Sequence, residues 1–339
     1  MKLNLDQIRS VTSGAVQITQ ETDGFHFFRF TKEQMELEHP YVPHLKRKFC
    51  ATAGIKLSFR TDSCSLYLRT DMTIGSGRGY YALDVVVNGV LCGGIDNFSH
   101  LELPDNYTEL VYERAVHETD IELGEGEKEV SIYFPWGACT VLQELALDDG
   151  SHMDSLVPSK KILVFGDSIA QGYDVLRPSC HHVSKLGLAL DAAVYNKALG
   201  GAVSFPELAQ ARESFDPDYI LVAYGTNDWR KIPLDDFLIR YRALLTAVGE
   251  NYPAAQVFLV TPIWRKDSDV TYAAGPFSDI ARHIHGIAAD FPSFHIIYGM
   301  DLIPHKESFY ADQYLHPNDD GFDQYFNHLW PQIERLVTL

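Results

Sequence analysis

After residue 160, short apolar runs alternate with helical patterns to the end of the chain. Strand-like runs lie at 161–165, 192–196, 218–224, 256–261 and 294–298. The clearest helix is expected over 234–249, where Phe237, Tyr241 and Leu244 fall on one face. Further helices are expected near 181–191, 206–214, 276–290 and 319–337. This alternation is typical of a parallel sheet covered on both faces, and five strands suit the flavodoxin-like order 2-1-3-4-5.

The first 150 residues have a different pattern, that of short β-strands. Leu57 and Phe59 alternate with polar neighbours, and the pair Asn88-Gly89 between two β-rich runs is a strong hairpin signal. We therefore expect an antiparallel β-sandwich of the jelly-roll kind over residues 1–150. The segment 148–160 is expected to lead from it into an α/β domain over residues 151–339.

Composition narrows the class of partner. Hydrophobic residues make up 46% of the 339, which is enough for proper cores, but no run approaches the ~18 apolar residues of a membrane span. Lys and Arg number 28 against 46 Asp and Glu, so the net charge of −18 argues against nucleic acid as a partner. The start of the chain shows no apolar signal core, from which we expect a cytoplasmic protein.

The five cysteines are scattered through the chain, and their number is odd. No Cys-x-x-Cys occurs, so free or buried thiols in a reducing compartment are expected rather than a disulfide framework. The histidines do not suggest a metal site either. His181 and His182 are adjacent in the sequence, so their side chains would point in different directions on a helix and could not share a metal ion. We therefore expect no metal, and we also expect no organic cofactor.

Four short polar blocks follow predicted strands and together suggest acyl transfer, which needs a nucleophile, a base and donors for an oxyanion. Ser168 follows the first strand as part of Gly-Asp-Ser and is the candidate nucleophile. The block 196–201 ends in Gly200 and Gly201, and a glycine there can offer a backbone N–H. Asn227 can donate from its side-chain amide, and His316 is the candidate base.

These blocks, in this order, resemble those of the SGNH hydrolases, also called GDSL esterases. The resemblance covers the carboxyl-terminal half and implies an oxyanion hole formed by Ser168, Gly201 and Asn227. The family usually places its catalytic acid three residues before the histidine, where this chain has Gln313. Asp312 stands four before it, so either Asp312 completes a triad or a backbone carbonyl orients His316 in a Ser–His dyad.

Aromatic and basic residues near these blocks are candidates for substrate contact. Trp229 follows the Asn block, and Trp264 and Arg265 follow the fourth strand at the same rim of the sheet. Each could instead pack beneath its loop. Trp136 is expected either at the domain boundary or facing a carbohydrate.

A β-sandwich ahead of an SGNH domain resembles certain carbohydrate acetylesterases. The resemblance implies a serine esterase that removes short acyl groups, acetyl above all, from a small-molecule or oligosaccharide ester. A general short-chain or lysophospholipase-like esterase is the alternative within the enzyme class. A carbohydrate-binding protein with a relict hydrolase domain is the alternative outside it. Transfer of the acyl group to another sugar, and self-association of the chain, are left open.

Overall fold

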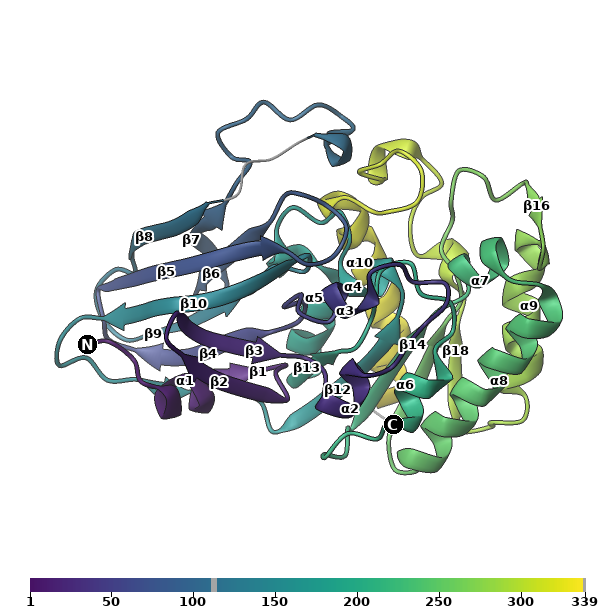
Figure 1. Cartoon of the computed structure of the whole chain (residues 1–339), viewed down its shortest axis with the longest axis horizontal. Coiled ribbons are helices and arrows are strands. Elements are labelled where there is room, and N and C mark those ends of the chain that lie inside the picture. The colour runs from purple at the N-terminus through teal and green to yellow at the C-terminus, as the bar shows by residue number, and fades with distance from the viewer. Residues whose placement is uncertain (111–114, 338–339) are drawn as a thin grey trace.

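A computed structural model describes residues 1–110 and 115–337. Two antiparallel sheets pack face to face in the first half of the chain, and a parallel sheet flanked by helices forms the second half (Figure 1). This confirms the expected β-sandwich followed by a doubly wound α/β sheet. The narrower jelly-roll assignment and the limit near residue 150 stay predictions.

The sandwich consists of two sheets of short strands. One has the order β1 (Thr12–Ser13), β4 (Lys56–Thr61), β9 (Lys128–Tyr133), β6 (Ala82–Val87) and β7 (Val90–Asp96), with β11 (Asp154–Ser155) also paired to β4. The other has the order β2 (Gln17–Glu21), β3 (Gly24–Phe28), β10 (Ala138–Leu147), β5 (Ser65–Ile74) and β8 (Val116–Glu122). Asn88 and Gly89 both have positive φ, 49° and 81°, and form the expected hairpin turn between β6 and β7.

The parallel sheet has the predicted order. Its strands run β13 (Ala192–Asn196), β12 (Lys160–Gly166), β14 (Tyr219–Ala223), β15 (Gln256–Val260) and β18 (Phe294–Ile297). A separate small hairpin joins β16 (Thr271–Tyr272) to β17 (Gly275–Pro276). The carboxyl ends of the five parallel strands lie at one edge, which is where working residues gather in such sheets.

Helices cover both faces of this sheet because successive residues of β12 point to opposite sides. Ile162 packs against α5 (His182–Ala189) and α10 (Asp319–Val337), whereas Leu163 packs against α6 (Pro206–Gln210), α8 (Leu234–Asn251) and α9 (Phe277–Ala288). The remaining helices are short: α1 (Leu5–Val11), α2 (Lys32–Met35), α3 (Leu45–Lys48), α4 (Ser168–Gln171) and α7 (Thr226–Lys231). Single 3-10 turns lie at Tyr107–Glu109, Pro178–Cys180, Gly299–Asp301 and Glu307–Phe309. Within the described residues, no helix combines the length and the apolar character that a membrane span requires.

The two halves are closely joined. Phe30, Val42, Leu45 and Phe49, all from the first half, belong to the same apolar cluster as the strands of the parallel sheet. The segment around α2 and α3 therefore leaves the sandwich and packs on the α/β domain, as Figure 1 shows.

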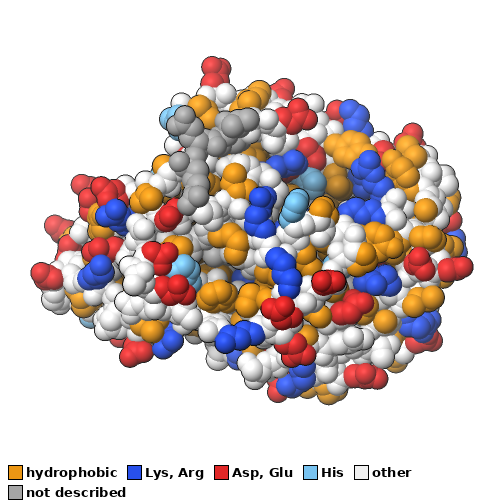
Figure 2. Space-filling model, viewed as in Figure 1, with side chains coloured by type: hydrophobic (Ala, Val, Ile, Leu, Met, Phe, Trp, Pro, Cys, Tyr) orange, Lys and Arg blue, Asp and Glu red, His pale blue; other side chains and the backbone are white. Residues whose placement is uncertain are grey.

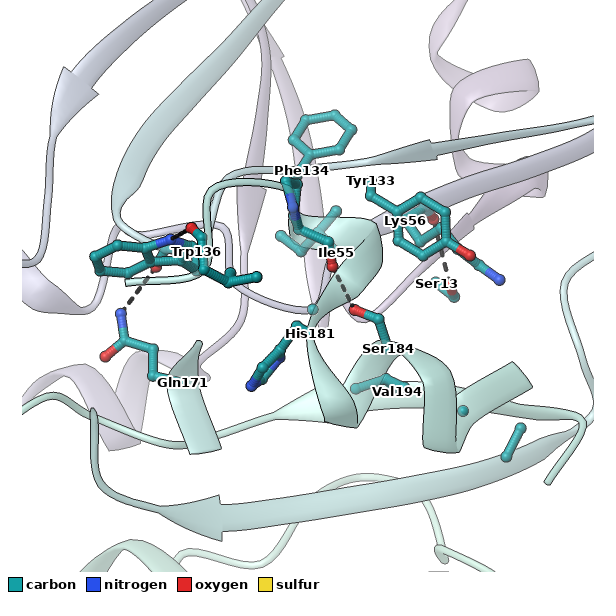
Figure 3. Close-up of a pocket in the computed structure, with 15 residues that line it drawn as sticks. Ser13, Ile55, Lys56, Tyr133, Phe134, Trp136, Gln171, His181, Ser184 and Val194 are labelled. Carbon is teal, nitrogen blue, oxygen red and sulfur yellow. Dashed lines mark hydrogen bonds between the residues drawn. The ribbon is translucent and has the colours of Figure 1, made fainter. Parts of the chain in front are cut away.

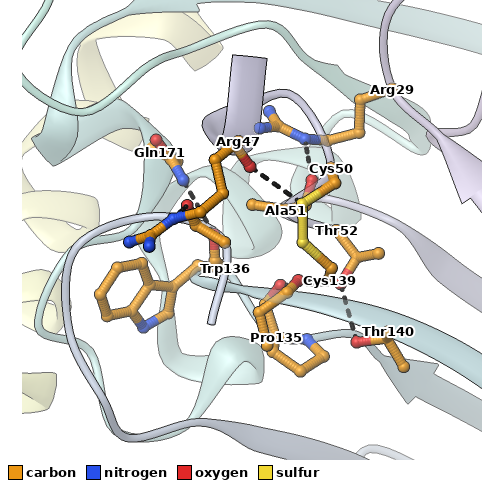
Figure 4. Close-up of a disulfide and its surroundings, with 12 residues drawn as sticks. Arg29, Arg47, Cys50, Ala51, Thr52, Pro135, Trp136, Cys139, Thr140 and Gln171 are labelled. Carbon is orange, nitrogen blue, oxygen red and sulfur yellow. Dashed lines mark hydrogen bonds between the residues drawn. A yellow bond between two sulfur atoms is a disulfide. The ribbon is translucent and has the colours of Figure 1, made fainter. Parts of the chain in front are cut away.

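One disulfide differs from the expectation of free thiols. Cys50 is bonded to Cys139, and their Cα atoms lie 5.0 Å apart (Figure 4). The bond joins the segment that follows α3 to strand β10, and the sequence concealed it because 89 positions separate the partners. Cys64, Cys92 and Cys180 are free. Disulfides persist mainly in oxidising compartments, so this bond does not support the expected cytoplasmic location, which stays a prediction.

Candidate active site

A sharp turn at the end of β12 presents Ser168. The chain passes directly from Gly166 into α4, of which Ser168 is the first residue. A Cβ atom at Gly166 would lie 2.6 Å from that of Ala170, so the turn requires glycine there. Asp167 caps the helix by accepting a hydrogen bond from the N–H of Ile169 at 3.0 Å. The Ser168 hydroxyl is thus fixed at the carboxyl edge of the parallel sheet.

A hydrogen-bonded chain of three side chains starts at this hydroxyl. Nε2 of His316 lies 2.9 Å from Oγ of Ser168. On the other side of the ring, Nδ1 of His316 lies 2.7 Å from Oδ2 of Asp312. The imidazole therefore bridges a nucleophile and a carboxylate, which is the arrangement of a serine hydrolase triad.

The loop before His316 accommodates its additional residue by a left-handed backbone conformation. Gln313 has φ of 52°, which curls the chain back toward the Asp312 side chain. Oδ1 of Asp312 accepts the backbone N–H groups of Tyr314, Leu315 and His316 at 3.0, 2.8 and 3.0 Å. Since Oδ2 remains for the imidazole, the geometry favours the triad over the dyad that the sequence left open.

The two charges of this pair support each other. Burial alone would raise the pKa of Asp312, but the hydrogen bond and charge of His316 and the backbone donors hold it well below its usual value. Burial alone would lower the pKa of His316, but the bond to Asp312 and the nearby negative charges raise it above 6.5. Asp312 is therefore ionised near neutrality, as a residue that stabilises an imidazolium must be.

A second carboxylate lies on the same side of the imidazole. Oδ2 of Asp174 is 3.5 Å from Nδ1 of His316, and the Asp174 side chain is fully buried. Arg78, from the loop between β5 and β6, donates two hydrogen bonds of 2.8 Å to the Asp174 carboxylate. Tyr80 donates a third at 2.7 Å. The sandwich therefore contributes directly to the surroundings of the catalytic base.

Sequence reasoning missed Asp174 and Arg78. Asp174 lies six positions after Ser168 in no block of the family, and its φ of 72° is unusual for a residue other than glycine. Arg78 belongs to the other half of the chain. The sequence carries no local signal for either residue, because the left-handed conformation of Asp174 and its pairing with Arg78 are visible only in the structure.

The candidate oxyanion donors lie on the neighbouring loops of the same edge. Gly201 has φ of 81° and follows β13, and its N–H has no acceptor among the described residues. The N–H of Gly200 is already used by Oε1 of Gln171 at 2.7 Å, which favours Gly201 as the donor. Nδ2 of Asn227, at the start of α7, is buried without a partner. An unpaired buried amide is costly and suits a group kept for a substrate oxygen.

The three residues expected to contact substrate lie in different surroundings. Trp229 is 0% exposed and donates from its indole to the carbonyl of Gly275 at 2.9 Å. Arg265 is 1% exposed and pairs with Asp267. Both side chains pack beneath their loops, which is the alternative that the sequence left open, and this burial does not support a substrate contact at either residue. Trp264 is half-buried, packs against Tyr310 and stacks on His305, and a substrate contact there stays a prediction.

Trp136 is 5% exposed and lies at the domain boundary rather than on a carbohydrate-facing surface. Its indole donates to the carbonyl of Val175 at 2.9 Å and packs 4.6 Å from the Tyr173 ring. A narrow pocket beside it is lined by both halves of the chain, including Tyr133 and His181 (Figure 3). Only about 20 Å³ of it is wide enough for water, so it does not suit an organic ligand.

Asp174, Asp312 and His316 also bring ligand atoms within 4.8 Å of one another, the spacing of a metal site. The donor set does not fit a cation. Arg78 already places a positive charge on both oxygens of Asp174, and Nδ1 of His316 is used by Asp312. The arrangement serves the imidazole rather than a metal.

A nucleophilic serine, a histidine base and a carboxylate at the edge of a doubly wound sheet define the site of a serine hydrolase. Residues 164–324 match the GDSL-like Lipase/Acylhydrolase family, so the second half of the chain is similar to this family, and the match together with the site supports an ester hydrolase. No curated protein matches the chain in sequence.

Solved structures of similar architecture cover nearly the whole chain. A salicylyl-acyltransferase, SsfX3, from a tetracycline biosynthetic pathway is 21% identical with a TM-score of 0.77, over 97% of this chain and 95% of that one. A putative GDSL-like lipase from Bacteroides ovatus is 17% identical with a TM-score of 0.75, over 100% and 98%. A family two carbohydrate esterase from Cellvibrio japonicus is 16% identical with a TM-score of 0.64, over 97% and 96%. At these identities the likeness concerns the fold.

Proposed function

We propose that this enzyme is a serine esterase that hydrolyses short acyl esters, acetyl above all, on carbohydrate. The observation that carries the proposal is the hydrogen-bonded chain from Ser168 through His316 to Asp312, with distances of 2.9 and 2.7 Å. These lengths are those required for proton transfer from the nucleophile to its base.

In the first half of the reaction, Oγ of Ser168 attacks the ester carbonyl while Nε2 of His316 takes its proton. The carbonyl oxygen becomes an oxyanion that accepts hydrogen bonds from the N–H groups of Ser168 and Gly201 and from Nδ2 of Asn227. The tetrahedral intermediate then collapses. His316 gives its proton to the departing alkoxide, and the acyl group stays on Ser168.

In the second half, His316 removes a proton from water as it attacks the acyl-enzyme. The same donors hold the second oxyanion, and the carboxylic acid leaves as Ser168 recovers its proton. Asp312 keeps its charge throughout and stabilises the imidazolium that forms twice in each cycle.

The fold supports carbohydrate as the alcohol part of the ester. The family two carbohydrate esterase from Cellvibrio japonicus and an acetyl xylan esterase from Butyrivibrio proteoclasticus, Est2A, share the two-part architecture, the latter with a TM-score of 0.62 over 100% of this chain. Architecture is an analogy for substrate, so the acyl and sugar preferences need a direct test.

The test is Ser168→Ala with para-nitrophenyl acetate and with acetylated xylo-oligosaccharides. Loss of turnover on both, together with loss of labelling by a fluorophosphonate, is expected. Undiminished turnover in the pure variant would contradict the proposal. A wild-type protein that neither turns over nor labels would instead be a carbohydrate-binding protein with a relict hydrolase domain. Faster turnover of longer acyl esters would point to a general short-chain or lysophospholipase-like esterase.

Acyl transfer is the second candidate, because an acyltransferase is among the proteins of similar fold. The acyl-enzyme on Ser168 is common to both reactions, and only the second nucleophile differs. Product analysis with added acceptor sugars separates them. An acylated acceptor would assign transfer, and free acid alone would assign hydrolysis.

A further inference from the structure

Two ammonium groups lie on the glycine loop of the active site. Nζ of Lys48 donates to the carbonyl of Gly200 at 2.6 Å, and Nζ of Lys231 donates to the carbonyl of Gly201 at 2.5 Å. A Cβ atom built on Gly201 would lie 3.4 Å from the Lys231 ammonium and 3.8 Å from that of Lys48. Because Gly201 carries a proposed oxyanion donor, both cations border the place where the ester carbonyl would sit.

Both ammonium groups donate to backbone carbonyls rather than to carboxylates. Among the described residues, neither Lys48 nor Lys231 has a carboxylate within 4.0 Å, whereas Lys46 on the same helix as Lys48 pairs with Glu36 at 3.1 Å. Such unpaired cations stand out in a chain of net charge −18. On the face shown in Figure 2, several Lys and Arg side chains gather around a hollow.

Two buried carboxyls, those of Asp167 and Asp228, act on the charge of Lys231 and raise its pKa against the effect of burial. Asp167 and Asp228 are buried, and burial raises the pKa of both, that of Asp167 to about 7. Burial therefore weakens the negative charge that these two carboxyls set against the lysines.

The closeness of the two ammonium groups is electrostatically unfavourable. Lys48 is half-buried, and burial followed by repulsion from Lys231 and Arg47 lowers its pKa to about 8. Backbone carbonyls accept hydrogen bonds but carry no net charge, so the repulsion remains. A negatively charged group on the substrate would relieve it and would gain two charge-assisted hydrogen bonds.

We propose that Lys48 and Lys231 form an anion-binding subsite of this esterase, and that its substrate carries a carboxylate within a few bonds of the scissile ester. The inference rests on the proposed serine esterase function. The carboxylate can belong to the acyl group or to the alcohol, for example an acidic sugar, and the experiment separates the two.

Two matched substrate pairs provide the test, at pH 7, below the pKa of Lys48. Para-nitrophenyl hemisuccinate and its methyl ester differ by one charge in the acyl part. Para-acetoxybenzoate and its methyl ester differ by one charge in the alcohol part. The wild-type kcat/KM should favour the charged member of one pair by about tenfold, and added salt should reduce that preference. If kcat/KM for the charged ester does not exceed that for its uncharged methyl ester in either pair, the inference is overturned.

The variants Lys48→Met and Lys231→Met, alone and combined, should reduce the charged-to-neutral ratio of kcat/KM by about tenfold. Lys48→Arg and Lys231→Arg keep the charge and should keep the ratio. Lys46→Met, on the same helix but paired with Glu36, is the matched control and should leave the ratio unchanged.

Other outcomes have distinct meanings. An equal loss on both members of a pair would mean that the lysines only support the glycine loop, which overturns the inference while the esterase assignment stands. If the wild-type enzyme hydrolyses none of the four esters, the proposed function itself fails, and this inference fails with it.

Discussion

The carboxylate of Asp174 lies 3.5 Å from Nδ1 of His316, on the ring nitrogen that Asp312 already contacts at 2.7 Å. The proposed catalytic base is therefore flanked by two acids, one from its own loop and one bound to Arg78 of the sandwich. The shorter contact belongs to Asp312, so we assign it the role of the triad acid. Asp174 is a positioning residue that acts through His316 and Arg78.

Asp312→Asn should lower kcat by two to four orders of magnitude, up to the ~10⁴ measured for the same change in a serine protease. The reason is that an amide cannot stabilise the imidazolium and can favour the wrong tautomer. Steady-state kinetics with para-nitrophenyl acetate measures the change. A loss of only a few-fold would mean that His316 works as a dyad or that Asp174 replaces the missing charge. Asp312→Asn combined with Asp174→Asn distinguishes these two cases.

Asp174→Asn should act on both stability and activity. It removes the closer of the two carboxylates that face the Arg78 guanidinium and leaves only Asp312 at 3.9 Å, so we expect a loss of about 2 kcal/mol in the free energy of unfolding. This is below the ~3–5 kcal/mol of a fully buried pair because Arg78 is 26% exposed. The apparent pKa of the catalytic base should also fall, a shift that a purely structural role would not produce. Denaturant unfolding and a pH–rate profile measure the two effects.

The pH dependence of kcat/KM follows from the raised pKa of His316. The imidazole must be neutral to accept the serine proton, so activity is present above its pKa and is lost as the pH falls through it. The midpoint should lie above 6.5 in the wild-type enzyme. In Asp312→Asn it should move to lower pH, because the largest favourable partner of the imidazolium is removed. A midpoint that does not move would argue against this pairing.

Asn227→Ala should separate catalysis from stability. Loss of one oxyanion donor costs about 10²–10³ in kcat, with little change in KM. Because Nδ2 of Asn227 is buried without a partner, removing it should not lower the melting temperature and can raise it. Thermal unfolding alongside kinetics checks both parts. A clear drop in melting temperature would mean that the amide has a structural partner instead.

The Cys50–Cys139 bond can be tested by mass spectrometry after alkylation with and without reductant. Only Cys64, Cys92 and Cys180 should react in the unreduced protein. Cys50→Ser should lower the free energy of unfolding by about 2–4 kcal/mol, since the bond closes a loop of 89 residues. Cys180→Ser, at a free and half-buried thiol, is the control and should change stability less. Five reactive thiols would restore the original expectation of a reduced protein.

The order of the parallel sheet could be predicted because each strand and each helix carries its own local pattern. Ser168, Gly201, Asn227 and His316 could be located because each follows a strand of that sheet. The role of Gln313 could not, since an additional residue in a loop is interpretable only when its backbone conformation is known. The orientation of Trp229 and Arg265 could not be predicted for a related reason: the sequence puts them at the right rim but does not say which way they point.

Contacts between the two halves of the chain could not be predicted from local sequence patterns. Arg78 and Asp174 are 96 positions apart, and neither belongs to a regular element. The disulfide partners are similarly remote. Nothing in the periodicity of either segment encodes such a pairing, which depends on how two complete domains meet.

The bidentate contact from Arg78 to Asp174 also bears on modular engineering. A graft of residues 151–339 onto another protein would carry the whole triad yet expose the Asp174 carboxylate beside an unshielded imidazole. Libraries built on this scaffold should therefore treat the β5–β6 loop as fixed together with the α/β domain. The segment that must be transferred as a whole is therefore larger than residues 164–324, the range of the family match.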